Sequence, residues 1–405
     1  MIKNITGGVC AAKGYKANGV HCGIRRNRTK RDLALIVSDV QANAAAVYTT
    51  NLVKGAPLTV TKDHIANGKA RAVICNSGNA NTCNANGIEI AEGMSDLLAK
   101  ELGFEANDVI VASTGVIGQP LDLAPIASGI PSLAAGLSYD GSAFASEAIM
   151  TTDTKPKEVA VSFEIGGVEC KIGGIAKGSG MIHPNMATML VFVTTDCAIS
   201  AEMLQKALSK DVKDSFNMVS VDGDTSTNDM VSVMANGLAG NPEITCEGAE
   251  FDAFCEALAA VTKPLCRMIA GDGEGATKLL ECRVSGAKGI PTAKVIAKSV
   301  ICSSLFKAAM FGADANWGRV LCAIGYAKTE TDINKVGVTF VSKAGSVEVC
   351  RNGAGIDFSE ELAKTVLSED EIIIDITLGD GEASAVAWGC DLTYDYVKIN
   401  GDYRT

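Results

Sequence analysis

The sequence predicts an α+β protein with strands and helices in layers, and three observations support this. Apolar runs of strand length, rich in β-branched residues, recur along the chain between glycine and asparagine turns. Amphipathic stretches with a helical period lie between them. At 405 residues, with 47% hydrophobic and 20% charged residues, the chain can fill a large core. From about Arg283 onward the pattern becomes that of a smaller α+β unit.

The first half of the chain is expected to be rich in strands. The expected strands span residues 33–40, 44–50, 72–75, 108–113, 159–165 and 168–172. The last two flank Gly166-Gly167, which is typical of a tight hairpin. A helix over residues 87–102 places Ile90, Met94 and Leu98 on one face and ends at Gly103.

The second half alternates helices and strands. Ser200 is expected to cap a helix that buries Leu204 and Leu208. Another helix spans about 250–268, with Pro264 marking a kink or a break. The remaining elements are expected to be helices over 298–311 and 358–367, and strands over 336–341, 372–378 and 384–388.

Composition excludes several classes of protein. A net charge of -11 argues against a nucleic-acid partner, which requires clustered lysine and arginine. No run of 18 apolar residues or signal-like start is present, so we expect a cytoplasmic protein without a membrane partner. The 14 cysteines are scattered without a Cys-x-x-Cys pair, and the 3 histidines are far apart, so we expect reduced thiols and no metal.

Residues 177–193 combine an irregular loop with a buried strand. They read Lys-Gly-Ser-Gly-Met-Ile-His-Pro-Asn-Met-Ala-Thr-Met-Leu-Val-Phe-Val, and the last five are all apolar. Thr188 stands at the junction. A threonine hydroxyl needs an adjacent base to act as a nucleophile, and its own α-amine can serve when threonine begins a chain. From composition alone, Thr188 could equally be the ordinary first residue of a strand.

Two glycine-containing turns also follow regular elements. Thr114-Gly115 follows the strand over 108–113 and can present a hydroxyl and an unhindered N–H. These are the parts of an oxyanion hole. An ordinary turn fits these residues as well. Residues 271–276 match the dinucleotide pattern G-x-G-x-x-A. No clean strand precedes that match, and the next acid, Glu281, is too near for the ribose position, so the match is weak.

The whole string from Lys177 to Leu190 resembles the autocleavage segment of the ornithine acetyltransferase (glutamate N-acetyltransferase, ArgJ) family. Three further strings match the family, at residues 113–118, 222–229 and 272–278, and the second is expected to support the pocket. The family often has proline where Ala315 stands, a loop difference remote from the chemistry. The resemblance implies an N-terminal-nucleophile-like αββα sandwich of the ArgJ/DmpA type with a smaller C-terminal α+β domain.

The resemblance also implies residue roles. Cleavage between Ala187 and Thr188 would give an α chain, 1–187, and a β chain, 188–405. In the β chain, residues 188–282 would complete the catalytic sandwich and residues 283–405 would form the C-terminal domain. Thr188 would be the nucleophile, and Thr114 with Gly115 would stabilise the oxyanion. The expected substrate-binding residues are Thr154, Lys177, Thr188, Glu274, Asn400 and Thr405.

Three functional hypotheses follow. The first is transfer of acetyl from N2-acetylornithine to glutamate by a ping-pong route in arginine biosynthesis. It includes acetyl-CoA as a possible further co-substrate, no other cofactor and an α2β2 assembly. An enzyme limited to the first transfer is a variant of this hypothesis. The second is a related self-cleaving amidohydrolase or aminopeptidase in which water accepts the acyl group. The third is a nucleotide-binding module based on the glycine strings.

Overall fold

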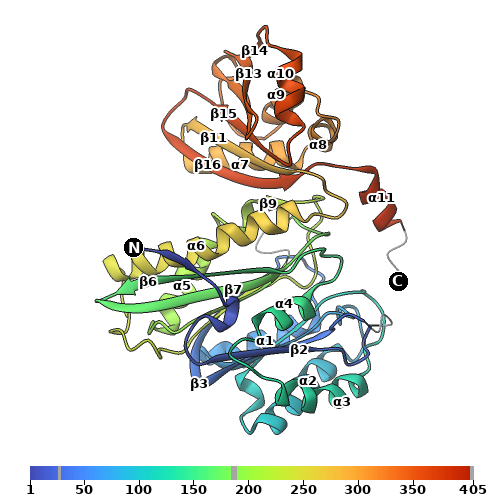
Figure 1. The fold of residues 1–405 in the computed structure, drawn as a ribbon, viewed down its shortest axis with the longest axis vertical. Coiled ribbons are helices and arrows are strands. Elements are labelled where there is room, and N and C mark those ends of the chain that lie inside the picture. The colour runs from blue at the N-terminus through green and yellow to red at the C-terminus, as the bar shows by residue number, and fades with distance from the viewer. Residues whose placement is uncertain (26–28, 184–188, 402–405) are drawn as a thin grey trace.

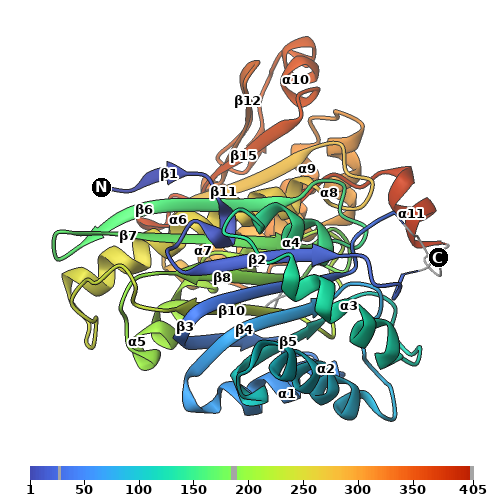
Figure 2. The same ribbon diagram turned by 60° about the horizontal axis from the view of Figure 1, so that its bottom comes forward.

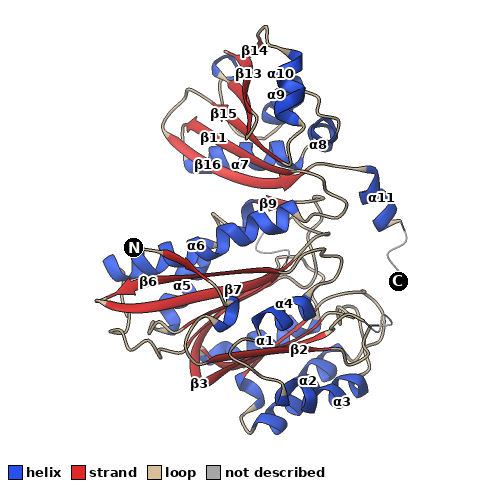
Figure 3. Ribbon diagram, in the orientation of Figure 1, coloured by secondary structure: helices blue, strands red, loops and turns tan. Residues whose placement is uncertain are grey.

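The computed structural model describes residues 1–25, 29–183 and 189–401 and places them in two β-sheets with helices around and between them (Figures 1 and 3). Among these residues, nine strands form the first sheet. Their order is β1 (Lys3–Ile5), β6 (Lys157–Ile165), β7 (Val168–Lys177), β8 (Leu190–Thr195), β10 (Met230–Ala235), β3 (Leu33–Tyr48), β4 (Lys69–Asn76) and β5 (Val109–Ser113), with β2 (Tyr15–Val20) also paired with β3.

Strand β8 lies inside this sheet. It pairs antiparallel with β7 and parallel with β10, and all of its residues are buried. Leu190 and Phe192 point to one face, whereas Val191 and Val193 point to the other, as strand geometry requires. The expectation of a strand buried on both faces is confirmed.

Helices cover both faces of the first sheet. Helix α4 (Ser142–Ile149) packs on the face of Leu190, and α5 (Ala201–Asp211) and α6 (Ala249–Gly271) pack on the face of Val191. The helices around the β3–β5 end are α1 (Ala56–His64), α2 (Gly87–Leu102) and α3 (Leu123–Ala135), and Figure 2 shows α1 and α2 beneath β5.

The second sheet has seven strands among the described residues. Their order is β14 (Ala354–Gly355), β13 (Gly345–Arg351), β12 (Gly337–Ser342), β15 (Glu371–Thr377), β11 (Leu279–Ala287), β16 (Ala383–Cys390) and β9 (Val219–Ser220). The later helices are α7 (Ile290–Cys302), α8 (Ser304–Phe311), α9 (Trp317–Gly325), α10 (Glu360–Leu367) and α11 (Tyr394–Asn400). Short 3₁₀ helices span Gly8–Cys10, Ile65–Asn67, Ala106–Asp108, Phe216–Met218 and Ile333–Lys335.

Helix α6 joins the two sheets. It contacts β6 and β7 of the first sheet and β11 and β16 of the second, and one continuous apolar core extends through both (Figure 1). The predicted α+β class is therefore confirmed.

Three predicted elements differ from the structure. The strands expected at 33–40 and 44–50 are one strand, β3, because pairing with β2, β4 and β10 carries it across a register shift between Val37 and Ala42. The break that was one of the two alternatives at Pro264 does not occur: helix α6 continues through this residue, and the nearby Val261 and Leu265 are buried in the core.

The helix expected at 298–311 is instead two helices, α7 and α8. Ser303 is extended (φ -70°, ψ 108°), and its hydroxyl accepts a hydrogen bond from the backbone N–H of Phe306. A serine in this role is a helix N-cap, which begins a new helix instead of continuing the old one.

Several features bear on the expected class of protein. None of the helices in the described part of the chain is long and apolar enough to cross a membrane. All 14 cysteines lie within the described residues and are free thiols. No group of three or more histidine, cysteine or acidic side chains in the described ranges could hold a metal ion.

Asp211, at the end of α5, gives a testable pH dependence. Burial raises its pKa to about 6, although hydrogen bonds from Ser215 Oγ (2.9 Å) and Thr262 Oγ1 (3.0 Å) oppose the rise. Because the pKa of Asp211 is higher in the folded state than in the unfolded state, its protonation adds to the free energy of unfolding. This contribution is complete below the unfolded-state pKa and is lost as the pH rises through 6. Asp211→Asn, which resembles the protonated acid, is expected to raise the free energy of unfolding at pH 7 by up to about 3 kcal/mol.

Urea unfolding at pH 4 and pH 7 measures this effect. The variant and the natural protein should have similar stabilities at pH 4. Equal stabilities at pH 7 would contradict a raised pKa of Asp211 in the folded state.

Candidate active site

The end of β7 meets the end of β5. Lys177, the last residue of β7, is 8% exposed and pairs with Leu190 at the start of β8. Its Nζ atom lies 3.5 Å from Oγ1 of Thr114, the residue that follows β5. Two residues assigned to the site by resemblance are thus brought together, although β5 and β7 lie far apart in the sheet order.

The Thr114-Gly115 turn has a backbone that only glycine fits easily. Gly115 has a φ of +129°, and a Cβ atom there would lie 2.7 Å from the carbonyl carbon of Gly78. Asn76 fixes the facing turn after β4, because its Oδ1 accepts hydrogen bonds from the N–H groups of Gly78 (3.2 Å) and Asn79 (3.1 Å). The two strand ends therefore lie side by side, which suits a site at the ends of neighbouring parallel strands.

The string 222–229 holds the loop that precedes residue 184. Asp222 accepts hydrogen bonds from the N–H groups of Met181 (2.6 Å) and Ile182 (2.9 Å), and the hydroxyl of Thr225 donates to the carbonyl of His183 (2.9 Å). Asn228 donates to the carbonyls of Ala80 (2.6 Å) and Ser113 (2.9 Å). Residues 222–229 therefore link the loop at 181–183 to the segments that follow β4 and end β5, which fits the expected role of supporting the pocket.

Glu274 and Asn400 form a second group beside the same loop. Asn400 Nδ2 donates to Glu274 Oε2 (2.7 Å), and the backbone N–H of Glu274 donates to the carbonyl of Ser179 (3.0 Å). Glu274 is 6% exposed, so its carboxylate is held inside the protein next to the Lys177–Gly180 segment.

Gly180 gives this group a sharp test. A Cβ atom at Gly180 would lie 2.3 Å from the Glu274 carboxylate, so alanine must displace the acid. Gly180→Ala is expected to raise the KM for the substrate about tenfold, a loss of about 1.4 kcal/mol in substrate binding. Steady-state kinetics with Gly167→Ala as control, where no atom lies within 4 Å, checks this; an unchanged KM would argue against a substrate role for Glu274.

Thr154 is held by Asp272 near the same place. The carboxylate of Asp272 accepts hydrogen bonds from the backbone N–H of Thr154 (3.0 Å) and from its hydroxyl. The ammonium of Lys157 contacts Asp272 (2.5 Å) and Asp153 (2.7 Å). The sequence has no local signal for a role of Asp153, Lys157 or Asp272, since no local pattern shows that residues more than 100 positions apart meet.

Three predicted site residues, Ala187, Thr188 and Thr405, lie outside the described residues. The chain is described again from Met189, which is 2% exposed and whose carbonyl accepts a hydrogen bond from the N–H of Met230 (2.9 Å). The described residues on either side of this segment, His183 and Met189, are therefore both held by hydrogen bonds to other parts of the chain.

Two titratable groups next to described strand or loop ends, His183 and Asp229, have shifted pKa values. Burial, with the nearby charge of Lys298, lowers the pKa of His183 to about 4, so its imidazole is neutral at pH 7. Burial raises the pKa of Asp229 well above its usual range, and among the described atoms its Oδ2 has no hydrogen-bond partner. Asp229 directly precedes β10, the neighbour of β8, and sequence analysis treated it only as part of the supporting string.

The dinucleotide pattern at 271–276 lacks the required structural context. Helix α6 ends at Gly271, and strand β11 begins at Leu279, so the glycines follow a helix instead of a strand. A dinucleotide-binding turn leads from a strand into a helix. The third hypothesis therefore loses its main support.

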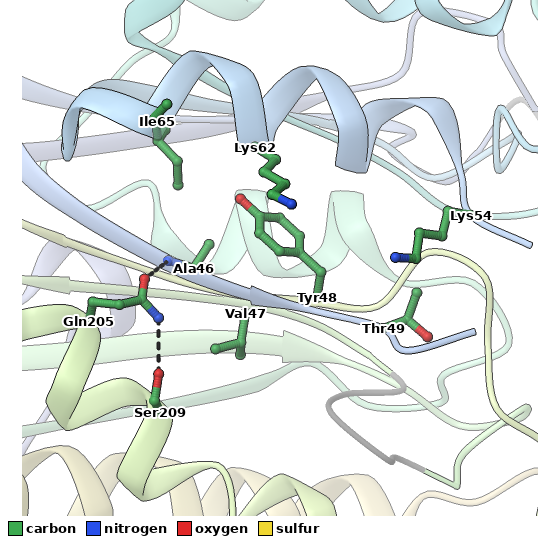
Figure 4. Close-up of a pocket in the computed structure, with 10 residues that line it drawn as sticks. Ala46, Val47, Tyr48, Thr49, Lys54, Lys62, Ile65, Gln205 and Ser209 are labelled. Atoms are coloured by element: carbon green, nitrogen blue, oxygen red, sulfur yellow. Dashed lines mark hydrogen bonds between the residues drawn. The ribbon is translucent and has the colours of Figure 1, made fainter. Parts of the chain in front are cut away.

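A separate groove lies away from these residues. A groove of about 560 Å³ runs between α1, α5 and β3 and is lined by Tyr48, Lys54, Lys62 and Gln205 among others (Figure 4). None of the predicted site residues lines it. The candidate site is therefore defined by its converging polar groups and not by this groove.

The fold is α+β, and its candidate site brings the glycine-rich segment at the end of β7 next to the Thr-Gly turn after β5. The chain belongs to the ArgJ family, whose model matches residues 16–405.

Close relatives extend over nearly the whole chain. The arginine biosynthesis bifunctional protein ArgJ of Symbiobacterium thermophilum is 52% identical over 403 residues, which cover 99% of each chain. The protein of the same name from Bacillus subtilis is 48% identical and covers 100% of this chain and 98% of its own. A crystal structure of arginine biosynthesis bifunctional protein ArgJ from Bacillus halodurans is similar with a TM-score of 0.50 and 45% identity, covering 53% of this chain and 99% of that chain.

Proposed function

We propose that this chain is a self-cleaving acetyltransferase of arginine biosynthesis that moves acetyl from N2-acetylornithine to glutamate through an acetyl-Thr188 ester. The observation that carries the proposal is the convergence of Thr114, Lys177 and Glu274 along the loop that leads to β8. These groups supply a hydroxyl, a cation and a carboxylate where a nucleophile at the start of β8 would need them.

The first step is cleavage of the chain. Thr188 Oγ1 attacks the carbonyl carbon of Ala187, the bond to the Thr188 nitrogen breaks, and water hydrolyses the resulting ester. Thr114 and Gly115 stabilise the oxyanion of the tetrahedral intermediate. The freed α-amine of Thr188, with a reference pKa of about 7.7 to 8, then serves as the general base.

The length of a solved relative matches the length of the expected β chain. Residues 188–405 make up 218 of the 405 residues (405 minus 187), or about 54% of the chain. The solved ArgJ chain from Bacillus halodurans matches 53% of this chain along 99% of its own length. A separate chain of that size is what scission between Ala187 and Thr188 would leave.

The mature enzyme uses the same hydroxyl for transfer. Thr188 Oγ1 attacks the acetyl carbonyl of N2-acetylornithine, ornithine leaves with a proton, and the amine of glutamate then takes the acetyl group and regenerates the hydroxyl. Lys177 pairs with the α-carboxylate shared by both substrates, and Thr154, Glu274, Asn400 and Thr405 complete the pocket.

Acetyl-CoA is proposed as a second acetyl donor, which would also give N-acetylglutamate synthesis. The support is that the close relatives are named bifunctional. The proposal includes no other cofactor and no metal.

A glutamate-dependence assay tests the transfer. The cleaved protein is incubated with N2-acetylornithine with and without glutamate, and ornithine release is expected to require glutamate and to match N-acetylglutamate formation one to one. Ornithine release without glutamate would instead favour the amidohydrolase hypothesis, in which water accepts the acyl group. Replacing acetylornithine by acetyl-CoA in the same assay tests the second donor.

The assembly is proposed to be α2β2 and cytoplasmic. In this division, residues 1–187 form the α chain, 188–282 complete the catalytic layers and 283–405 form a C-terminal domain, which begins within β11. A sedimentation mass of a single αβ unit would contradict the tetramer.

A further inference from the structure

We propose that Asp153, Lys157 and Asp272 form a positioning cluster for the proposed reaction, with separate duties for its two acids. Asp272 fixes the Thr154 hydroxyl for substrate binding, whereas Asp153 fixes the Lys177-Gly178 turn for cleavage and catalysis. Lys157 holds both acids in place. This inference rests on the proposed function, and none of the three residues touches the substrate in it.

The cluster is buried and internally paired. The side chains of Lys157 and Asp153 are 1% and 0% exposed, and that of Asp272 is 8% exposed. Lys157 Nζ lies 2.7 Å from Asp153 Oδ1, 2.5 Å from Asp272 Oδ2 and 3.4 Å from the carbonyl of Lys155. Its three protons therefore have three acceptors, and no water is needed to satisfy them.

Asp272 faces the substrate side of the cluster. Besides the Thr154 hydroxyl, it accepts hydrogen bonds from the N–H groups of Thr154 (3.0 Å) and Lys155 (3.4 Å). Its own carbonyl accepts a hydrogen bond from Ser179 Oγ (2.7 Å). Since Glu274 is only two residues further on, Asp272 sets Thr154 relative to the turn that carries Glu274.

Asp153 faces the loop side. Its Oδ1 accepts a hydrogen bond from the N–H of Gly178 (2.7 Å), and its Oδ2 accepts one from the N–H of Thr151 (2.9 Å). Burial would raise the pKa of Asp153, but the charges of Lys157 and Lys177 outweigh it and lower the pKa to about 2. The acid is thus ionised at every working pH and holds the residue next to Lys177.

A structural role alone would not require this division. A buried ion cluster contributes little net stability compared with apolar side chains of the same size, because desolvation offsets the attraction between the charges. Here the hydrogen bonds from the two acids lead to different site segments. The acids also lie on opposite sides of the proposed scission, since Asp153 precedes residue 187 and Asp272 follows it.

The variants Asp272→Asn and Asp153→Asn test the two roles separately, namely positioning of Thr154 and positioning of the Lys177-Gly178 turn. Asp272→Asn leaves Lys157 paired with Asp153 and is expected to raise the KM for N2-acetylornithine at least about tenfold, with kcat changed less than about threefold and cleavage complete. Asp153→Asn is expected to slow cleavage at least about tenfold and to lower kcat, with a smaller change in KM. Asp252→Asn, an exposed acid on α6, is the matched control and should change none of these.

Thr154→Val tests the substrate side without altering the three charges. It should raise KM as much as Asp272→Asn does, and the double variant should have the KM of Thr154→Val within about twofold, because Asp272 acts through this hydroxyl. The inference would be overturned if the KM of the double variant rose by the product of the two single effects. An unchanged KM in Thr154→Val would overturn it as well.

The readouts distinguish this inference from the proposed function. If the natural protein is uncut or transfers no acetyl group, the proposed function fails before any variant is compared. If the natural protein is active while Asp272→Asn and Asp153→Asn lower only the melting temperature, the proposed function stands and the positioning cluster is rejected.

Discussion

Thr188→Ala is expected to yield one uncut chain of 41.9 kDa with no measurable acetyl transfer. Alanine has no hydroxyl to attack the preceding carbonyl, so neither the scission nor the acetyl-enzyme can form. Removal of a covalent nucleophile reduces kcat on the order of 10⁶-fold in a well-studied protease. A denaturing gel with intact mass, followed by an ornithine-release assay, measures both effects.

Thr188→Ser provides the matched control, because serine keeps the hydroxyl and loses only a methyl group. It should still be cut between residues 187 and 188 and should retain partial transfer activity. Full activity in an uncut Thr188→Ala protein would refute the proposed mechanism.

Gly115→Ala is expected to reduce both cleavage and kcat by about 10²- to 10³-fold, the loss found when one oxyanion donor is removed. The added Cβ would lie 2.7 Å from the Gly78 carbonyl carbon and 2.8 Å from the Asn79 nitrogen, and both are backbone atoms that cannot rotate away. The turn must shift, and the Thr114 hydroxyl and Gly115 N–H shift with it. Single-turnover assays and a cleavage time course measure the loss.

Gly103→Ala separates backbone strain from loss of the oxyanion donors. Gly103 follows α2 with a φ of +73°, but no atom lies within 4 Å of a Cβ placed there. It should cost about 1 kcal/mol of stability and leave kcat unchanged. Equal losses of kcat in the two variants would mean that Gly115 matters only for stability.

Local patterns predicted the elements well where one residue type dominated. The buried strand β8 followed from five consecutive apolar residues, and α2 followed from its apolar face and the glycine at its end. The break at Ser303 was missed because serine is also tolerated within helices, and only its extended backbone and cap hydrogen bond reveal the break. Pro264 left a break open as one alternative, and no break occurs because the helix residues on both sides of it are buried in the core.

The site was predictable only in part. The Lys177 and Thr114 positions followed from strings that resemble a family, and the structure places their side chains next to each other. The contact of Lys157 with Asp272 spans 115 positions in the sequence and has no local signal. Such contacts depend on the complete fold, so a single sequence without related sequences does not reveal them.

The strand order has a consequence for how the two product chains can be made. Strands β8 and β10 come after the proposed scission point, but they are inserted between β7 and β3, which come before it. The fragment 1–187, synthesised alone, would have a gap in its sheet with two bare edges, and such edges readily pair with other molecules. Scission must therefore follow folding, and co-expressing the two fragments should recover far less soluble protein than one intact precursor does.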